Sequence, residues 1–214
     1  MRVLIACEFS GIVREAFHRR GHDAWSCDLL PTEIEGPHIQ DDVLLHLDDG
    51  WDMMIAFPPC TYLCSSGLHW NKRRPERAEK TKDAVIFALN LLGVGFVENR
   101  IPKIAMENPI GCLSTYYRKP DQIIQPWQFG HPESKATCIW TINLPILKPT
   151  KILTSRGGNP RRGWDNQTPS GQNKLGPSPE RASNRSRTYT GIAEAMAEQW
   201  SLYDRASHSR PAEE

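Results

Sequence analysis

The sequence lacks the features that mark several protein classes. None of its six cysteines forms a CxxC pair. Cys60 and Cys64 stand at CxxxC spacing with no tandem histidines beside them, so neither a disulfide framework nor a structural zinc site is expected. The apolar run from Val3 to Cys7 is too short for a signal peptide or a membrane span. These absences predict a cytoplasmic protein with free thiols, no metal and no membrane partner.

The charge balance of the whole chain is equally uninformative about partners. Lys and Arg number 26 against 25 Asp and Glu, for a formal net charge of +1. Any argument for a nucleic-acid partner must therefore come from local clusters. Hydrophobic residues make up 39% and charged residues 24% of 214 residues, which predicts one globular domain able to bury a core.

Short apolar runs alternate with helical patterns in the first half of the chain. We predict strands at 3–7, 24–27, 51–56 and 101–106, and helices at 12–20 and 81–95, while 43–47 is ambiguous. This order predicts an α/β fold, a Rossmann-like doubly wound sheet that is mostly parallel. Loops after the strand ends would then form the site.

The second half divides into regions of different composition. Residues 123–147 are rich in strand formers, with 137–142 as the best strand, and 190–200 has a helical pattern. We predict a catalytic domain at 1–150 and 188–205, a basic Gly/Pro-rich loop or minimal recognition insertion at 151–187, and a tail at 206–214. The segment from 154 to 187 contains seven positively charged residues and only two negatively charged ones.

Three sites along the first half could hold a nucleotide-like ligand. Phe9-Ser10-Gly11 follows the first strand, where a tight turn and a helix N-terminus can approach a ligand, or simply connect two elements. Asp28 ends the second strand, where an acidic residue commonly holds ribose hydroxyls, although a solvated turn carboxylate fits as well. Asp42 is suited to an adenine amino group.

Two later runs carry reactive side chains at strand ends. In Pro58-Pro59-Cys60 the prolines hold Cys60 rigidly at the sheet edge. A thiol near a helix start has a lowered pKa and is a ready nucleophile, whereas most free cysteines are only small buried hydrophobes. Glu107, followed by Asn108-Pro109, is expected to be a partly buried carboxyl with a raised pKa that can donate a proton, or a turn residue.

This ordered set of motifs resembles the DNA cytosine-5 methyltransferase family. The resemblance covers residues 1–145 and 188–202, and the late run Tyr189-Thr190-Gly191 is similar to a motif that returns beside the cofactor. The pattern departs from the family at several positions: Cys7 replaces an aspartate, Val13 a glycine, Thr61 a glutamine and Pro109 a valine, and the strand at 135–140 lacks the family's arginines.

The resemblance implies a Rossmann-like S-adenosylmethionine (SAM)-dependent enzyme. Cys60 would add to carbon 6 of cytosine and Glu107 would bind N3, with Lys135 and Thr137 in place of the missing arginines. The residues implied in SAM binding are Phe9, Ser10, Gly11, Asp28, Asp42 and Pro58. The partner would be DNA, either a duplex whose target base is flipped out or a single strand.

The family's large recognition domain has no room in this chain. Phosphates could instead meet the basic loop, and Trp164 could stack on a base, although such loops are often only solvated. The arginines expected there are Arg156, Arg161, Arg162, Arg185 and Arg187. We therefore expect a small, phage-type enzyme with little sequence selectivity. The alternatives are C5 modification of a free nucleotide such as dCMP, and an inactive SAM-fold protein that binds nucleic acid.

Overall fold

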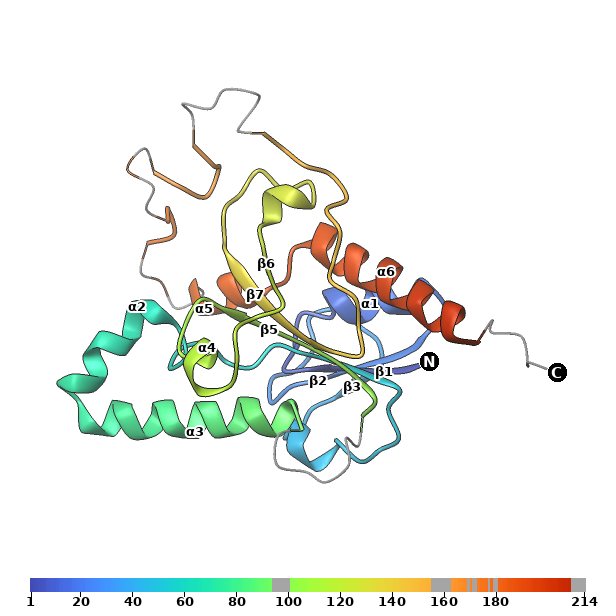
Figure 1. Ribbon diagram of the computed structural model, residues 1–214, viewed down its shortest axis with the longest axis horizontal. Helices are drawn as coiled ribbons and strands as arrows, with labels where there is room; N and C mark the ends of the chain where they lie inside the picture. The colour runs from blue at the N-terminus through green and yellow to red at the C-terminus, as the bar shows by residue number, and fades with distance from the viewer. Residues whose placement is uncertain are drawn as a thin grey trace.

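A seven-stranded sheet forms the centre of the protein, with strand order β3-β2-β1-β4-β5-β7-β6 (Figure 1). The computed structural model describes residues 1–93, 101–154, 163–168, 170, 173–176, 178 and 181–208. The strands are β1 (Arg2–Ala6), β2 (Asp23–Cys27), β3 (His38–Ile39), β4 (Met53–Ala56), β5 (Lys103–Pro109), β6 (Gln122–Ile124) and β7 (Thr137–Ile142).

The strand directions place the ends of the central strands at one edge. β1 is parallel to both β2 and β4, and β5 is parallel to β4. β7 runs antiparallel to its two neighbours, β5 and β6. This arrangement confirms the predicted fold class, a Rossmann-like sheet that is mostly parallel. The loops that follow β1, β2, β4 and β5 consequently meet at the carboxyl edge.

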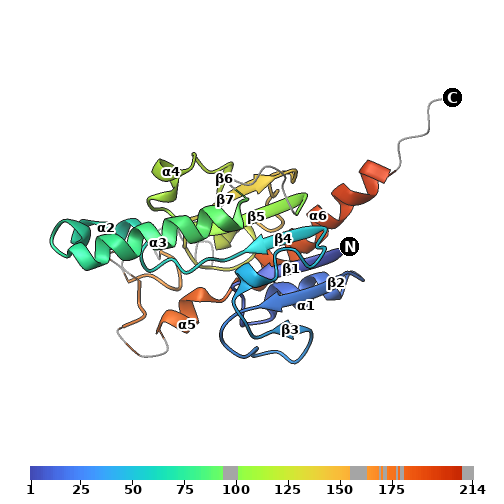
Figure 2. The same ribbon diagram turned by 90° about the horizontal axis from the view of Figure 1, so that it is seen from below.

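Helices cover both faces of the sheet (Figure 2). Helices α1 (Ile12–His18) and α6 (Thr190–His208) pack on one face, and α3 (Pro75–Leu91) packs on the other. Strand residues alternate between the two cores: Val3 and Ile5 of β1 face α1 and α6, whereas Leu4 and Ala6 face α3. The apolar spacing of the helices therefore reflects real burial.

The structure extends or corrects the expected elements in several places. Glu107, Asn108 and Pro109 belong to β5 itself, because β7 pairs with all three. The ambiguous segment is a 3₁₀ helix, Val43–Leu45. Helix α6 continues to His208, so 206–208 are helical rather than tail, and 209–214 lie outside the described residues. Elements not predicted are β3, α2 (Ser65–Leu68), η2 (His69–Lys72), α4 (Leu113–Tyr116), η3 (Pro126–Gln128) and α5 (Arg181–Ser186).

Candidate active site at the carboxyl edge of the sheet

A buried hydrogen bond joins the ends of β4 and β5. The two strands are parallel, with Ala56 opposite Met106. Just beyond this pair, the amide nitrogen Nδ2 of Asn108 donates to the carbonyl oxygen of Pro58 over 2.9 Å. Asn108 is only 1% exposed. The loop that carries Cys60 is thus held directly beside the strand that carries Glu107.

The loop after Cys60 is also tied to the chain beyond β5. The N–H of Ser65 donates to the carbonyl of Ile110, and the N–H of Cys112 donates to the carbonyl of Leu63. Gly111 permits this close approach, because a Cβ there would stand 1.9 Å from the Leu63 oxygen. Helix α2 begins only at Ser65, so Cys60 lies before the helix rather than at its start.

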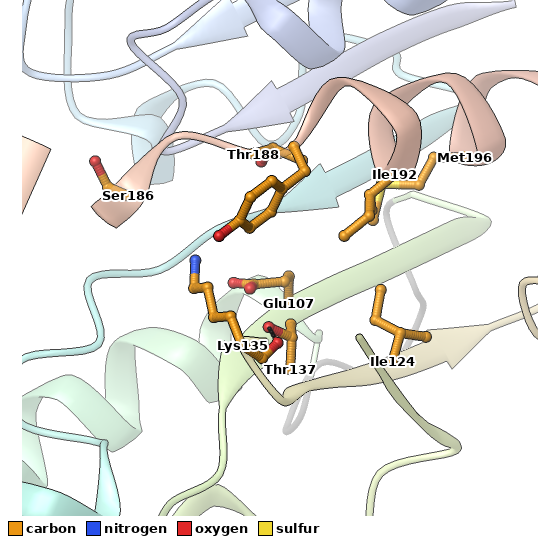
Figure 3. Close-up of a pocket in the computed structure, with 9 residues that line it drawn as sticks. Glu107, Ile124, Lys135, Thr137, Ser186, Thr188, Ile192 and Met196 are labelled. Atoms are coloured by element: carbon orange, nitrogen blue, oxygen red, sulfur yellow. Dashed lines mark hydrogen bonds between the residues drawn. The ribbon is translucent and has the colours of Figure 1, made fainter. Parts of the chain in front are cut away.

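A pocket opens between the last strands and α6, with Glu107 on its wall (Figure 3). Lys135 and Thr137 extend toward Glu107 from the segment that enters β7. The Thr137 hydroxyl hydrogen bonds with the Glu107 carboxylate, and the Lys135 ammonium donates to the carbonyl of Arg185 over 2.9 Å. The structure therefore places Glu107, Lys135 and Thr137 on one pocket wall, and Cys60 lies close enough for the charges of Glu107 and Lys135 to act on its thiol.

The electrostatics of the two reactive groups differ in one respect from expectation. Burial raises the pKa of Glu107, while the Lys135 charge and the Thr137 hydrogen bond oppose that rise. A raised pKa was predicted for this carboxyl. The lowered pKa predicted for Cys60 is wrong: partial dehydration raises the pKa of its thiol, and the nearby Glu107 charge adds to the rise. Lys135 and Arg185 act in the opposite direction.

The returning segment that leads into the first turn of α6 closes the pocket. The Tyr189 hydroxyl donates to Glu133 over 2.5 Å, and the N–H of Gly191 donates to Nε2 of His131 over 2.9 Å. A Cβ on Gly191 would stand 2.0 Å from the carbonyl oxygen of Phe129. The motif at 189–191 was expected beside the cofactor, but Glu133 and His131 carry no sequence pattern that would have indicated their roles.

The turn after β1 has the backbone shape that a close ligand approach requires. Gly11 has φ 74°, a left-handed conformation that favours glycine, and it leads directly into α1. The buried carboxylate of Glu8 accepts hydrogen bonds from the Val13 N–H and the Ser10 hydroxyl. Glu8 was not predicted as a site residue. Its hydrogen bonds connect the two sides of the turn and so stabilise it.

The predicted cofactor residues lie at this same edge and fit an adenosyl group chemically. Asp28 accepts the N–H of Leu30, and Asp42 accepts the N–H of Leu44, each through Oδ1. No hydrogen bond from a described residue reaches Oδ2 of either carboxylate, so this atom could accept one from a hydroxyl or amino group. Leu29 is 72% exposed beside Asp28 and offers an apolar surface to a base. Pro58 is buried at the end of β4.

Hydrogen bonds to Arg14 and to Phe9 hold the loop between β2 and β3 in place. The fully buried guanidinium of Arg14 donates to the carbonyls of Ile34 and Glu35 and to the hydroxyl of Ser26. The N–H of Glu33 donates to the carbonyl of Phe9 over 2.8 Å. Arg14 was missed because it reads as a polar position of α1, although it lies next to the apolar Val13.

The residues predicted to contact nucleic acid differ in their surroundings. Arg187 forms a two-point ion pair with Glu33, at 2.6 and 2.8 Å, so its guanidinium already has a partner within the chain. Trp164 stacks on Trp127, with ring centroids 5.7 Å apart. The positive charge of Arg185 lowers the pKa of the Cys60 thiol. Arg156, Arg161 and Arg162 lie outside the described residues.

The described residues hold neither a candidate metal site nor a membrane-spanning helix. No group of three or more His, Cys, Asp or Glu side chains there could hold a metal ion. Within the same residues, every helix is too short or too polar to cross a bilayer.

Comparison with known proteins yields distant structural similarity. No protein-family model and no curated protein matches the sequence. A protein described as a DNA modification methyltransferase from prophage Cp of E. coli is 15% identical, with a TM-score of 0.46 over 72% of this chain and 52% of that one. The methyltransferase EhMeth of Entamoeba histolytica is 15% identical, with a TM-score of 0.47 over 72% and 57%.

A variant of DNMT2 from Spodoptera frugiperda is 16% identical, with a TM-score of 0.39 over 72% of this chain and 54% of that one. The chain thus spans little more than half the length of each solved structure. The class that the fold and site define is a Rossmann-like α/β protein with a thiol and a carboxyl of raised pKa on neighbouring strand ends.

Proposed function

We propose that this protein is a SAM-dependent methyltransferase that modifies carbon 5 of cytosine in DNA through a covalent bond between Cys60 and carbon 6. The observation that carries the proposal is the hydrogen bond from Asn108 to Pro58, which holds the Cys60 loop against Glu107. A thiol and a protonatable carboxyl at adjacent strand ends are the two groups that this chemistry needs.

Cys60 acts as the nucleophile because carbon 5 of cytosine is unreactive by itself. Its thiolate adds to carbon 6 while Glu107 gives a proton or a hydrogen bond to N3, and the ring becomes an enamine with a nucleophilic carbon 5. SAM, when bound, supplies the electrophilic methyl group. After carbon 5 has gained the methyl group, a base removes its remaining proton. The sulfur of Cys60 then leaves, and the ring double bond is restored.

The protonation states of Cys60 and Glu107 are coupled, because the charge of Glu107 raises the pKa of the Cys60 thiol. A proton on Glu107 therefore favours the thiolate of Cys60. Lys135 and Arg185 favour the thiolate, because their positive charges lower the pKa of Cys60. We assign Lys135 and Thr137 the role of orienting Glu107 toward the base.

The proposed cofactor residues would hold SAM at the carboxyl edge. Asp28 would accept the ribose hydroxyls, Asp42 the adenine amino group, and the Phe9-Ser10-Gly11 turn would pack beside the methionine part. Pro58 would contact the part of SAM that carries the methyl group. The acceptors present support this assignment, because the carboxylates of Asp28 and Asp42 both lie close enough to Cys7, at the end of β1, for their charges to add to the rise that burial causes in the pKa of its thiol. Leu29 adds an exposed apolar surface.

Trapping with 5-fluorocytosine DNA tests the chemistry, because fluorine at carbon 5 cannot leave as a proton and the enzyme stays attached. We expect a SAM-dependent covalent adduct that Cys60→Ala abolishes. Cys64→Ala is the matched control, since this thiol lies four residues further along the same loop and should be dispensable. An adduct that persists in Cys60→Ala would overturn the proposal.

Nucleoside mass spectrometry on DNA from cells that express the protein tests the product. We expect 5-methylcytosine with the native protein and none with Cys60→Ser. Competition between duplex DNA and dCMP then tests the substrate. Methyl transfer to dCMP without transfer to any polymer would refute the assignment to DNA, and salt-dependent binding without any product would indicate an inactive binding protein.

A further inference from the structure

The segment after the Cys60 loop forms a projecting tip with a strong positive charge. This α2–α3 tip, residues 61–82, comprises α2, η2 and the first turns of α3. It contains six basic residues against two acidic ones, Glu76 and Glu79. The basic residues are Lys72, Arg73, Arg74, Arg77, Lys80 and Lys82. The chain as a whole has a net charge of only +1, so this concentration is local.

Two arginines of the tip are arranged around an aromatic ring. The guanidinium carbons of Arg73 and Arg74 lie 5.9 and 5.2 Å from the ring centroid of Trp70, which is itself 40% exposed. Neither arginine forms an ion pair with any described acidic residue. The ring restrains both side chains while it leaves their N–H edges free to bind a planar or tetrahedral oxyanion.

A third arginine connects the tip to the active site. Arg77 donates to the carbonyls of Thr61 over 2.8 Å and Gly67 over 3.2 Å, and its guanidinium carbon lies 4.8 Å from the Tyr62 ring centroid. Thr61 directly follows Cys60 in the chain. The position of the tip is therefore coupled to the loop that carries the nucleophile.

The tip also stands on the correct side of the molecule for a role in substrate binding. In Figures 1 and 2, α2 and the start of α3 extend beyond the carboxyl ends of the strands, on the same side as α5. Arg185 of α5 lies close enough to Cys60 to lower the pKa of its thiol. A polymer with one base at Cys60 would thus meet positive charge from two separate elements.

We propose that the α2–α3 tip binds the sugar-phosphate backbone of the nucleic-acid strand that carries the target base, with Arg73 and Arg74 on phosphates. Arginine matches phosphate through paired N–H donors, and phosphates flank every base of a polymer. The inference rests on the proposed function, in which the substrate is a polymer. It adds a contact surface outside the basic loop at 151–187.

Binding of a fluorescent oligothymidine measured by anisotropy tests the proposal, because this probe has phosphates but no cytosine. Each phosphate contact on a single strand contributes about 0.7 to the slope of log K against log salt. Arg73→Ala/Arg74→Ala should therefore reduce the slope by about 1.4 and weaken binding about 25-fold near 0.1 M salt. Trp70→Ala should weaken binding severalfold with the slope unchanged, because the charges remain.

Arg2→Ala/Lys148→Ala is the matched control. This double variant also removes two positive charges. The guanidinium carbon of Arg2 lies 4.6 Å from the ring centroid of Trp51, but Arg2 begins β1, at the end of the strand away from the carboxyl edge. We expect the slope and the affinity of this control to remain close to those of the native protein. Equal losses in both double variants would overturn the proposal, since only net charge would then matter. Circular dichroism excludes unfolding as the cause.

The outcome is independent of methyl transfer. If the protein produces 5-methylcytosine but Arg73→Ala/Arg74→Ala binds oligothymidine normally, the tip is not the backbone site and the proposed function stands. If the double variant loses binding while no 5-methylcytosine forms with the native protein, the tip is confirmed and the proposed chemistry fails.

Discussion

The side-chain amide of Asn108 donates a 2.9 Å hydrogen bond to the carbonyl of Pro58, and both groups are buried at the junction of two parallel strands. This bond fixes the distance between the Cys60 loop and Glu107. Backbone bonds from Cys112 to Leu63 and from Ser65 to Ile110 tie the remainder of the loop to the chain beyond β5.

Asn108→Ala should therefore impair catalysis more than stability. Loss of the bond leaves a buried carbonyl without a partner, which costs about 1–3 kcal/mol of unfolding free energy. The displaced thiol should reduce kcat about 100-fold, because small errors in position have large effects on rate. Methyl-transfer kinetics and chemical denaturation measure the two effects.

Asn143→Gly is the control for this prediction. Asn143 also donates through its side-chain amide to a proline carbonyl, that of Pro102, at 2.8 Å but at an exposed position. Its φ of 53° suits glycine, so the substitution adds no backbone strain. A similar loss of kcat in both variants would contradict the role assigned to Asn108.

The charges around Cys60 predict opposite effects of two substitutions on its thiol. Glu107→Gln should lower the pKa of Cys60, because the Glu107 charge raises it, and Lys135→Ala should raise this pKa further. The rate of iodoacetamide alkylation of Cys60 against pH, in a Cys64→Ala background, measures both shifts. A profile unchanged by both substitutions would show that the three groups are not coupled.

Glu107 should reduce stability near neutral pH. Its pKa is higher in the folded protein than in the unfolded chain, so the folded state binds its proton more tightly. Stability from this group is fully present below the unfolded pKa, about 4.3, and is lost as the pH rises through the folded pKa.

The Glu107→Gln variant should not lose this stability as the pH rises, because glutamine does not ionise. Its unfolding free energy relative to the native protein should therefore be smallest in acid and increase with pH up to the folded pKa of Glu107. Denaturation at several pH values measures the difference, while methyl transfer should be almost abolished. A constant difference across this pH range would contradict the raised pKa.

The ion pair between Arg187 and Glu33 should contribute more to ligand binding than to stability. Its side chains are 35% and 38% exposed, so water screens the pair and a double-mutant cycle should give a coupling of about 0.2–1 kcal/mol. Because Glu33 belongs to the loop over the Phe9 turn, Arg187→Ala should weaken SAM binding severalfold in calorimetry. Arg187→Lys, which lacks the planar fork, should recover binding only in part.

Local patterns were sufficient for most of the framework. The apolar runs at β1, β2, β4 and β5 predict buried parallel strands because each is short and bounded by turn residues. The same patterns place Cys60 and Glu107 after or at strand ends. Their adjacency follows from the parallel pairing of β4 with β5.

Other features could not be read locally. The two-residue β3 exists only because β2 offers it a partner, and α2 is too short to show a helical period. Arg14 reads as a surface residue, but the loop at 32–37 closes over its guanidinium. The Arg187–Glu33 pair joins residues 154 positions apart, a distance that no periodicity records.

The sequence alone determined the fold class, because periodicity and turn chemistry are local properties, and the resemblance of its ordered motifs to a known family indicated the candidate reactive groups. Only the tertiary structure decided how those groups behave. The thiol of Cys60 has a raised rather than a lowered pKa, because chain folding dehydrates it and brings the Glu107 charge near. Folding likewise paired Arg187 with Glu33 and left Arg73 and Arg74 unpaired among the described residues, since charge pairing depends on which distant segments meet.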